Sequence, residues 1–411
     1  MEKDSQLISV SFNKGAYIFV EGNQNSGCFF IIQKGKVRIS VEVTGGRGDE
    51  NEVLGPGDFI GVVPVMACQS HIETAMALTN VVLVKVFRQQ YIGLIQSNAP
   101  IAMKIITQFS KRLRYLNEAL AQLTLSETAV VGSSHLFKVG EYYFNNKQYA
   151  PALYAYAKYA KFCPQGERIL IVKERLKKMA GLIKSLKTEY EGSQINRTYQ
   201  KNAMLFAEGE PGEELFVIQK GSVKIAKIAD NNESILAILK AGDIFGEMAL
   251  LEDKPRMASA VAYEDSNVMA INKANFDQLF FSQPQLAEKI TTILADWIWF
   301  IYKKLANALI IDPVGRVYDA LQIQLEKNRV PLDGSFSQPF HTFDFGWTEL
   351  LGMAGLSAEQ NNPNLMKIKK NSKIQIMENK IHILSVMEIV RQAKYHRGMG
   401  RRDKVKRGAG I

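Results

Sequence analysis

The sequence has few cysteines and no long uninterrupted apolar run. Cys28, Cys68 and Cys163 lie far apart, without the close spacing of a metal site. We therefore expect neither a disulfide framework nor a zinc cluster, which fits a reducing compartment. The most apolar stretch, DWIWFIYKKLANALII, is interrupted by Lys303 and Lys304. It falls short of the roughly 20 apolar residues that span a bilayer, so we expect no membrane association.

The sequence also lacks the signals of export and of catalysis. The N-terminal segment MEKDSQLISV is charged and has no apolar core of the kind found in signal peptides, which predicts a cytoplasmic location. The five histidines have no metal-ligand spacing, and there is no Gly-Lys-Ser/Thr phosphate loop. We therefore expect a protein that is not an enzyme and holds no metal.

The basic excess lies at the C-terminal end. Of 51 Lys+Arg and 41 Asp+Glu, residues 364–411 hold 13 and 3, which leaves 38 of each sign elsewhere. The net charge of +10 therefore resides in this segment. A basic end attracts polyanions such as nucleic acid. A solvated basic tail over residues 391–411 is the alternative.

A pattern of short β-rich segments occurs twice in the chain. Three pairs of segments repeat at offsets of 187, 186 and 185 residues: KGAYIFVEG at 14–22 with KNAMLFAEG at 201–209, FFIIQKGKVRI at 29–39 with LFVIQKGSVKI at 215–225, and VLGPGDFIG at 53–61 with ILKAGDIFG at 238–246. Short β-branched and aromatic runs that end in glycine are typical of strands joined by tight turns. Each copy therefore predicts a small antiparallel β-roll.

A long amphipathic helix is predicted after each roll. Apolar residues recur at steps of three and four along both stretches. The two predicted stripes are Ile105, Phe109, Leu113, Leu116, Leu120 and Leu123, and Ile290, Leu294, Trp297, Ile301, Leu305 and Ala308. Their length favours pairing of each helix with another helix over packing on its own roll. The two helices can pair within one chain, or the second can form a homodimer through Trp297, Trp299 and Ile301.

These features together resemble a known family. The roll segments, the box GDIFGEMALL, the following Pro-Arg and the long helix are similar to the cyclic nucleotide-binding domain family. That family includes bacterial catabolite activators, fumarate-nitrate regulators and the regulatory subunits of cAMP-dependent kinases. The resemblance covers residues 10–124 and 195–311. It implies an α+β protein with two jelly-roll-like β-rolls, each followed by a long helix.

The box of the second roll carries the groups that a cyclic nucleotide requires. Glu247 can accept a hydrogen bond from a ribose 2′-hydroxyl, and Arg256 can donate charge-assisted bonds to the phosphate. The turn at the glycine can offer backbone N–H groups to the same anion. The resemblance assigns the glutamate and the arginine these roles. The candidate ligand residues of the box are Gly246, Glu247, Met248, Ala249, Arg256, Met257 and Ser259. A surface salt bridge between Glu247 and Arg256 is the alternative.

The first roll lacks this pair of charges. Val62 stands at the position of Glu247, His71 at that of Arg256 and Thr74 at that of Ser259. Valine would leave a ribose hydroxyl without a partner, which costs affinity. The first roll is therefore expected to be structural, with binding of an altered nucleotide as the alternative.

The identity of the nucleotide stays open. In the resembled family the long helix contacts the base, and the matching positions here are Ile301 and Tyr302. Tyr302 can donate a hydrogen bond or stack on a base. Neither position offers the pair of hydroxyls used by cAMP-responsive activators. cAMP, cGMP and a cyclic dinucleotide all remain candidates.

A helical insert separates the rolls. Residues 133–166 resemble a single tetratricopeptide repeat at seven positions: Leu136, Val139, Gly140, Tyr143, Ala152, Tyr156 and Pro164. A further helix, ERILIVKERLKKMAGLIKSLK, follows. A lone repeat cannot bury its own apolar face. We expect a packed spacer, with docking of a protein partner as the alternative.

The C-terminal segment resembles a winged helix-turn-helix over residues 312–386. Asp312 and Pro313 predict a helix start. Asn362-Pro363 predicts that the expected recognition helix runs from Pro363 to about Asn371. The base-reading arginines of the family are absent, because Ala358 and Asn361 occupy that stretch. The candidate contacts to DNA phosphates are Lys367, Lys369, Lys370 and Lys373.

Five domains follow from these patterns. They are a degenerate nucleotide-binding roll at 1–125, the insert at 126–190, the second roll with its helix at 191–311, the winged helix at 312–390 and the basic tail at 391–411. The predicted function is a transcription regulator that binds a cyclic nucleotide in the second roll and DNA through the C-terminal module. A nucleotide-sensing adaptor or scaffold that does not bind DNA is the alternative.

Overall fold

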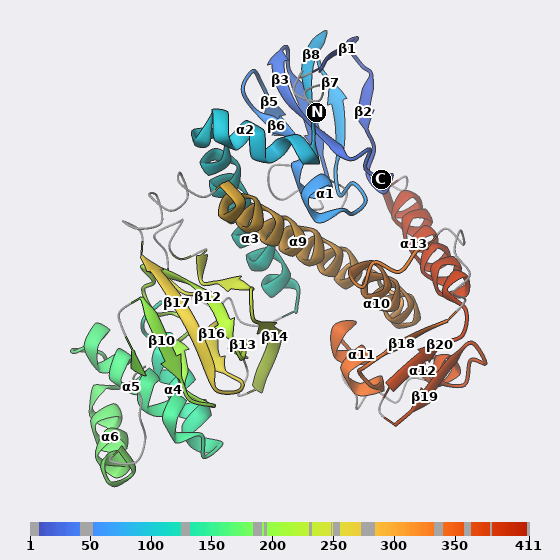
Figure 1. The fold of residues 1–411 in the computed structure, drawn as a ribbon. Coiled ribbons are helices and arrows are strands. Elements are labelled where there is room, and N and C mark those ends of the chain that lie inside the picture. Colours follow the sequence, from blue (N-terminus) through green and yellow to red (C-terminus); the bar gives the residue numbers. More distant parts are fainter. Residues whose placement is uncertain are drawn as a thin grey trace. The chain divides into compact units, whose positions relative to one another are not determined.

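The computed structural model describes most of the chain. The described residues are 8–41, 52–124, 132–183, 191–192, 195–229, 232–247, 249, 255–272, 284–332, 340–356, 363–378 and 380–408. The chain divides into two compact units. Unit one comprises Met1–Gly93, Arg112–Ser126 and Thr291–Ile411, and unit two comprises Leu94–Lys111 and Glu127–Ile290. Each unit contains one β-roll with its own hydrophobic core (Figure 1).

The first roll consists of two four-stranded antiparallel sheets. Their orders are β1-β8-β3-β6 and β2-β7-β4-β5. The strands are β1 Ile8–Phe12, β2 Tyr17–Phe19, β3 Cys28–Lys34, β4 Val37–Ser40, β5 Glu52–Leu54, β6 Phe59–Ile60, β7 Thr74–Ala77 and β8 Val81–Phe87. Alternate side chains point inward from each strand, so Ile32, Val37, Ile60 and Leu83 meet in one core.

The second roll repeats this topology and adds the short strand β9 at one edge. Its sheets have the orders β15-β12-β17-β10-β9 and β11-β16-β13-β14. The strands are β9 Glu191–Gly192, β10 Asn196–Tyr199, β11 Met204–Phe206, β12 Glu214–Lys220, β13 Ser222–Ala229, β14 Asn232–Lys240, β15 Ile244–Phe245, β16 Ser259–Ala262 and β17 Ser266–Asn272. Even the register shifts correspond, at Tyr17/Phe19 and at Met204/Phe206. The predicted α+β fold with two β-rolls is confirmed.

The helical stretch after the first roll is divided in two. Helix α2 covers Tyr91–Ser97 and α3 covers Ala99–Thr124. The break falls just before Pro100, whose missing N–H suits the first turn of a new helix. The predicted stripe of α3 is buried from Ile105 to Leu116. Leu123, at its end, is 52% exposed, so this part of the prediction is wrong.

The long helix after the second roll, α9, covers Pro284–Ala308. Its buried face includes Ile298, Trp299 and Tyr302, whereas the predicted stripe used Trp297 and Ile301, which are only half-buried. Three positions of the predicted stripe, Ile290, Leu294 and Leu305, are buried as predicted. The other three are only half-buried. Trp299 is 2% exposed, so its predicted role in a homodimer surface is wrong.

The insert is a helical hairpin followed by a third helix. Helix α4 covers His135–Asn145, α5 Tyr149–Phe162 and α6 Ile169–Ile183. A Cβ on Gly140 would lie 2.6 Å from the Tyr156 ring, so glycine allows α4 and α5 to approach closely. The hairpin shares its core with Met204, Ala207 and Val261 of the second roll. The insert therefore packs on a roll, as expected of a spacer.

The C-terminal module combines four helices with a three-stranded sheet. The elements are α10 Pro313–Lys327, β18 His341–Phe343, α11 Trp347–Met353, α12 Pro363–Lys369, β19 Ile374–Met377, β20 Lys380–Ile383 and α13 Val386–Gly408. The sheet order is β18-β20-β19. The Asp312 carboxylate caps α10 by accepting the Val314 N–H at 3.1 Å. Helix α12 begins at Pro363, as the sequence predicted.

The predicted domain boundary at residue 390 falls inside α13. Ala393 is buried in the core of the C-terminal module. His396 stacks on Tyr318 and lies 2.7 Å from the Asp312 carboxylate, while Arg397 pairs with Asp319. Residues 391–397 are therefore part of the folded module, because their inward side chains have partners there, and a tail beginning at 391 is wrong. Among the described residues, none of the helices has the length and apolarity to cross a bilayer.

Two glycines of the first roll give a test of backbone strain. Gly35 and Gly22 both have positive φ, +93° and +85°. A Cβ on Gly35 would lie 2.5 Å from the Asn80 carbonyl oxygen, whereas a Cβ on Gly22 would meet nothing within 4 Å. We expect Gly22→Ala to lower the free energy of unfolding by about 1 kcal/mol, and Gly35→Ala by a further ~1–3 kcal/mol from overpacking. Urea unfolding measures both, and equal losses would contradict the predicted clash.

Candidate functional site

The candidate box lies between strands β15 and β16 of the second roll. Gly246 follows β15 with φ +80°, and Glu247 and Ala249 are helical. A Cβ on Gly246 would lie 2.8 Å from Arg256 Nη1. This position therefore needs glycine for its backbone conformation and for the approach of the guanidinium. The candidate residue Met248 lies outside the described residues.

Glu247 carries a buried carboxylate that has no hydrogen-bond partner in any other described residue. Its side chain is 1% exposed, and within the described part of the chain neither carboxylate oxygen has a hydrogen-bond partner. Burial raises its pKa to about 7, although its own backbone N–H and the charge of Arg256 partly lower it. An unpaired buried polar group costs stability. The acceptor capacity of Glu247 is therefore left over within the described part of the chain.

Arg256 is also buried, and its guanidinium is only partly satisfied. Nη1 donates to the Gly246 carbonyl at 2.6 Å and Nη2 to the Glu214 carbonyl at 2.7 Å. Nε has no partner among the described residues. The guanidinium lies 4.2 Å from the centre of the Phe206 ring, a cation–π contact. Burial lowers its pKa, opposed by nearby acidic groups, Glu210 foremost.

The surface salt bridge considered for this pair is not what the structure contains. Both Glu247 and Arg256 are buried, and the guanidinium donates to carbonyl oxygens instead of the carboxylate. Each of the two buried groups has hydrogen-bonding capacity left over in the described part of the chain. A ligand with an alcohol and an anion can satisfy both.

The other predicted box residues have distinct positions. Ala249 is buried, and its Cβ lies 2.7 Å from where a Cβ on Gly212 would stand. Met257 is half-buried. Ser259 is fully buried, and its hydroxyl accepts the Glu208 N–H at 2.9 Å. Ser259 therefore ties the loop before β12 to β16, a structural contact that its predicted pocket role did not include.

Sequence reasoning missed the groups that hold Arg256. Gly212 lies directly beneath the guanidinium, because a Cβ there would be 2.4 Å from Nε. Phe206 offers its ring and Glu214 its backbone carbonyl. The segment AEGEPGEEL, with two glycines and a proline before β12, was the available signal. The contacts of a backbone carbonyl depend on strand pairing, which residue types do not reveal.

The candidate base contacts lie in unit one. Ile301 is half-buried. Tyr302 is 2% exposed, and its hydroxyl donates to the Glu21 carboxylate of the first roll at 2.7 Å. A base contact from this hydroxyl would require that bond to break, so the base contact stays a prediction.

The first roll keeps the architecture of the box without its charges. Val62 is buried at the start of helix α1, Val62–Ala67. His71 stacks on Phe19 with ring centroids 4.2 Å apart, as Arg256 lies over Phe206. Burial lowers the pKa of His71, which favours the neutral ring. Thr74 accepts the Glu21 N–H at 3.0 Å, as Ser259 does for Glu208.

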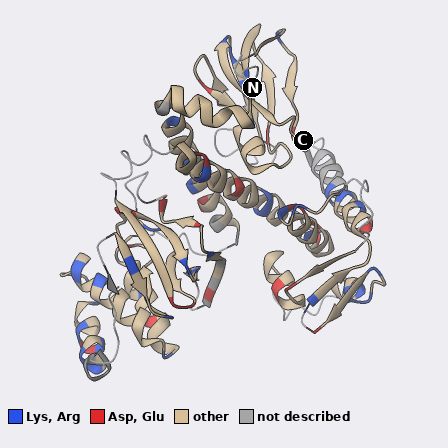
Figure 2. Cartoon of the chain, viewed as in Figure 1, with Lys and Arg blue, Asp and Glu red and all other residues tan. Residues whose placement is uncertain are grey.

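The C-terminal module exposes several lysine side chains on and after helix α12. Lys367, Lys369, Lys370 and Lys373 are all exposed, and Leu365 and Ile368 are buried beneath them. Lysine and arginine positions appear in blue in Figure 2. Among the described residues, no group of three His, Cys, Asp or Glu side chains is arranged to hold a metal ion.

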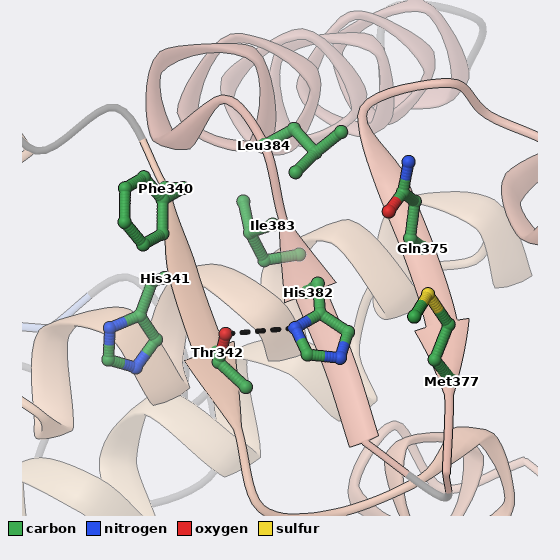
Figure 3. A pocket seen from close by; sticks show the side chains of 8 residues that line it. All are labelled: Phe340, His341, Thr342, Gln375, Met377, His382, Ile383 and Leu384. Atoms are coloured by element: carbon green, nitrogen blue, oxygen red, sulfur yellow. Dashed lines mark hydrogen bonds between the residues drawn. The ribbon is translucent and has the colours of Figure 1, made fainter.

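A separate shallow hollow lies on the sheet of this module. It has a volume of about 200 Å³. Figure 3 shows its lining, in which the Thr342 hydroxyl and His382 Nδ1 lie 2.9 Å apart. Met377, Gln375 and Phe340 complete its rim. The residues that line this hollow include neither an acid nor an arginine, in contrast to the box of the second roll. The hollow belongs to unit one.

Comparison with known proteins gives a match to both rolls. A family model described as "Cyclic nucleotide-binding domain" matches residues 9–98 and 196–283. The chain carries two cyclic nucleotide-binding domains. The first lacks both charged residues of the box, and the second has them.

Relatives include regulators of two kinds. The "CRP-like cAMP-activated global transcriptional regulator" of Mycobacterium tuberculosis is 26% identical over 48% of this chain and 87% of that protein. The "cAMP-dependent protein kinase regulatory subunit" of Colletotrichum orbiculare is 38% identical over 22% of this chain and 24% of that protein. The crystal structure of Thermus thermophilus catabolite activator protein is 25% identical, with TM-score 0.28, over 49% of this chain and 90% of that one.

The raised pKa of Glu247 predicts a pH-dependent stability. Between its ordinary value of 4.5 and about 7, the folded carboxyl keeps a proton that the unfolded chain has released. Stability therefore falls as pH rises through this window. Glu247→Gln, always neutral, should be more stable than the wild type at pH 8, by up to about 3 kcal/mol, and similar to it at pH 4.5. Urea unfolding at both pH values measures the difference.

Glu264→Gln, on the exposed surface of the same roll, is the matched control. It should leave the difference between the two pH values unchanged. If Glu247→Gln gains nothing at pH 8, the carboxylate has a partner and is not a vacant acceptor.

Proposed function

We propose that this protein is a cyclic nucleotide-responsive regulator whose working site lies in the second roll. The observation that carries the proposal is the buried carboxylate of Glu247, without a hydrogen-bond partner in the described part of the chain, beside an Arg256 whose Nε is unsatisfied there. A buried acceptor and a buried cationic donor match a ribose hydroxyl and a phosphodiester.

The proposed binding follows from the donors that remain. Arg256 Nε donates to the phosphate, while Nη1 and Nη2 keep their carbonyl partners and hold the guanidinium in place. Glu247 accepts from the ribose 2′-hydroxyl. Gly246, Met248 and Ala249 approach the sugar and phosphate, and Met257 with Ser259 line the rest. No metal takes part in this proposal.

The nucleotide itself is cAMP, cGMP or a cyclic dinucleotide. The relatives named for cAMP favour cAMP. Tyr302 and Ile301 are the proposed base contacts, and the bond from Tyr302 to Glu21 would then be exchanged for one to the ligand. A ligand can shift the balance between the conformation with the Tyr302–Glu21 bond and one without it only by the difference in its binding free energy for the two.

The proposed output is transcription regulation in the cytoplasm. The C-terminal module has the order of a winged helix, and its exposed lysines on and after α12 suit a phosphate backbone. The two classes of relatives leave an adaptor that binds protein and not DNA as the second candidate. A protein partner at the insert would meet its outer surface, where Leu170 is exposed. A homodimer through Trp297 and Ile301 is a further proposal.

Calorimetric titration tests the site. We expect one of cAMP, cGMP, cyclic di-AMP or cyclic di-GMP to bind saturably to the wild type. Arg256→Gln should weaken that affinity by roughly 100-fold, because the phosphate then has no buried cation to pair with. His71→Gln, at the matching position of the first roll, should leave it unchanged. Equal effects of the two variants, or no binding of any probe, would remove the proposal.

Salt-dependent retention on duplex DNA tests the output. A protein that grips phosphates loses affinity linearly on a logarithmic salt scale. Lys367→Gln with Lys369→Gln should reduce that slope by about 2, roughly one for each phosphate that is no longer neutralised. Lys161→Gln with Lys177→Gln, on exposed positions of the insert, is the control. Absence of retention at low salt would favour the adaptor.

A further inference from the structure

One of the contacts between the insert and the second roll involves the buried carboxylate of Glu210. Glu210 is 5% exposed. Lys158 Nζ, from α5, lies 2.6 Å from its Oε1, and the Tyr154 hydroxyl, also from α5, lies 3.1 Å from its Oε2. The Ala207 N–H donates to the same Oε2 at 3.0 Å. Two side chains of one insert helix therefore hold an acid of the roll.

The segment that carries Glu210 also encloses Arg256. The Arg256 N–H donates to the Glu210 carbonyl at 2.7 Å, and the Gly209 N–H donates to the Arg256 carbonyl at 2.9 Å. Pro211 and Pro255 form a bridge next to these bonds. Gly212, two residues after Glu210, lies against the guanidinium. The position of this segment therefore sets the position of Arg256.

Several ionisable groups face Arg256 within the described chain. Its charge interacts with Glu210 most strongly, followed by Tyr154, Glu214 and Glu247. Glu214 already accepts a bidentate pair of bonds from Arg197. Glu210 is balanced by Lys158. The charge of Arg256 thus interacts both with an acid neutralised by the insert and with Glu247, whose carboxylate has no other described partner.

We infer that helix α5 positions the phosphate-binding cation: Lys158 and Tyr154 hold Glu210 away from Arg256, so the helical insert is part of the nucleotide site. The inference rests on the proposed function, because it assigns a regulation to the same site. Lys158 and Tyr154 are positioning residues, since neither contacts Arg256 by a hydrogen bond among the contacts of the described chain.

The physical reason is competition for one carboxylate. With Lys158 present, the charge of Glu210 is neutralised at 2.6 Å. Without it, Arg256 is the next cation for that charge in a site of low dielectric. The guanidinium would then turn toward Glu210 and away from a phosphate. A partner that displaces α5 would act in the same way, and by linkage a bound nucleotide would change the affinity for that partner equally.

The first arm of the test measures nucleotide affinity. cAMP, cGMP, cyclic di-AMP and cyclic di-GMP are titrated into the full chain. For the probe that binds, Lys158→Met should weaken affinity by about 5- to 10-fold. Lys161→Met, on the same helix with its ammonium over Phe162, is the control and should change nothing. The double variant Lys158→Met with Glu210→Gln should return to within about twofold of the wild type, because a neutral amide no longer competes for Arg256.

The second arm needs no ligand. The stability gain of Glu247→Gln over the wild type levels off near the pH midpoint at which Glu247 titrates in the folded protein, and the charge of Arg256 lowers this midpoint. In the Lys158→Met background this midpoint should rise by about half a pH unit, because Arg256 no longer offsets the burial of Glu247. In the double variant Lys158→Met with Glu210→Gln, the midpoint should return to its wild-type value. A rescue by Glu210→Gln is not expected of a purely structural contact.

The outcomes distinguish a failure of the proposed function from a failure of the inference about helix α5. If no probe binds the wild type, the proposed function fails, and the midpoint shift with its rescue alone decides whether α5 positions Arg256. If a probe binds and Lys158→Met leaves its affinity unchanged, the inference is overturned. A loss of affinity that Glu210→Gln does not rescue also overturns it, because simple destabilisation would then explain the loss.

Discussion

The second roll is organised around one buried guanidinium. A charge removed from water needs compensation, and Arg256 obtains it from the carbonyls of Gly246 and Glu214 and from the face of Phe206. Glycine at 246 and at 212 leaves the space that the guanidinium occupies. The cation is therefore oriented before any ligand arrives. What remains unsatisfied, Nε and the Glu247 carboxylate in the described chain, defines the chemistry that fits.

The sequence was informative where a local pattern carried the structure. The offsets near 187 predicted two rolls, and the strand orders and register shifts agree. Proline fixed the starts of α10 and α12, because its backbone suits the first turn. Glu247 and Arg256 stood out because the box that contains them resembles the cyclic nucleotide-binding domain family. The stripe predicted on α9 is buried at Ile290, Leu294 and Leu305 but only half-buried at Trp297 and Ile301, because the elements packed beside a helix decide which flank is covered.

Long-range contacts escaped prediction for a physical reason. Glu210 looks like a surface acid in AEGEPGEEL, and only folding brings Lys158 and Tyr154 from the insert to its carboxylate. The helix through Ala393 was taken for a tail, because a composition rich in Lys and Arg hides the few inward residues. Residue types report local preference, whereas partners across the chain depend on how the elements pack.

The matching glutamates of the two rolls differ in the partners of their carboxylates. Glu208 and Glu21 each have their N–H bound by a hydroxyl of the roll, Ser259 or Thr74. Their carboxylates meet different partners: Glu208 lies 3.4 Å from His135 Nε2 of the insert, and Glu21 accepts from Tyr302 of α9.

In the first roll, Glu21 therefore holds helix α9 of the same chain through Tyr302. Gln69 adds to this by donating to the Glu326 carbonyl at the end of α10. Val62 and a neutral His71 suit that role, because a structural box needs filled apolar space and no charge that waits for a ligand. Helix α9 follows the second roll in the chain, and its Tyr302 is hydrogen-bonded to the first. A ligand that rearranges α9 at Tyr302 must therefore provide more binding free energy than these contacts contribute.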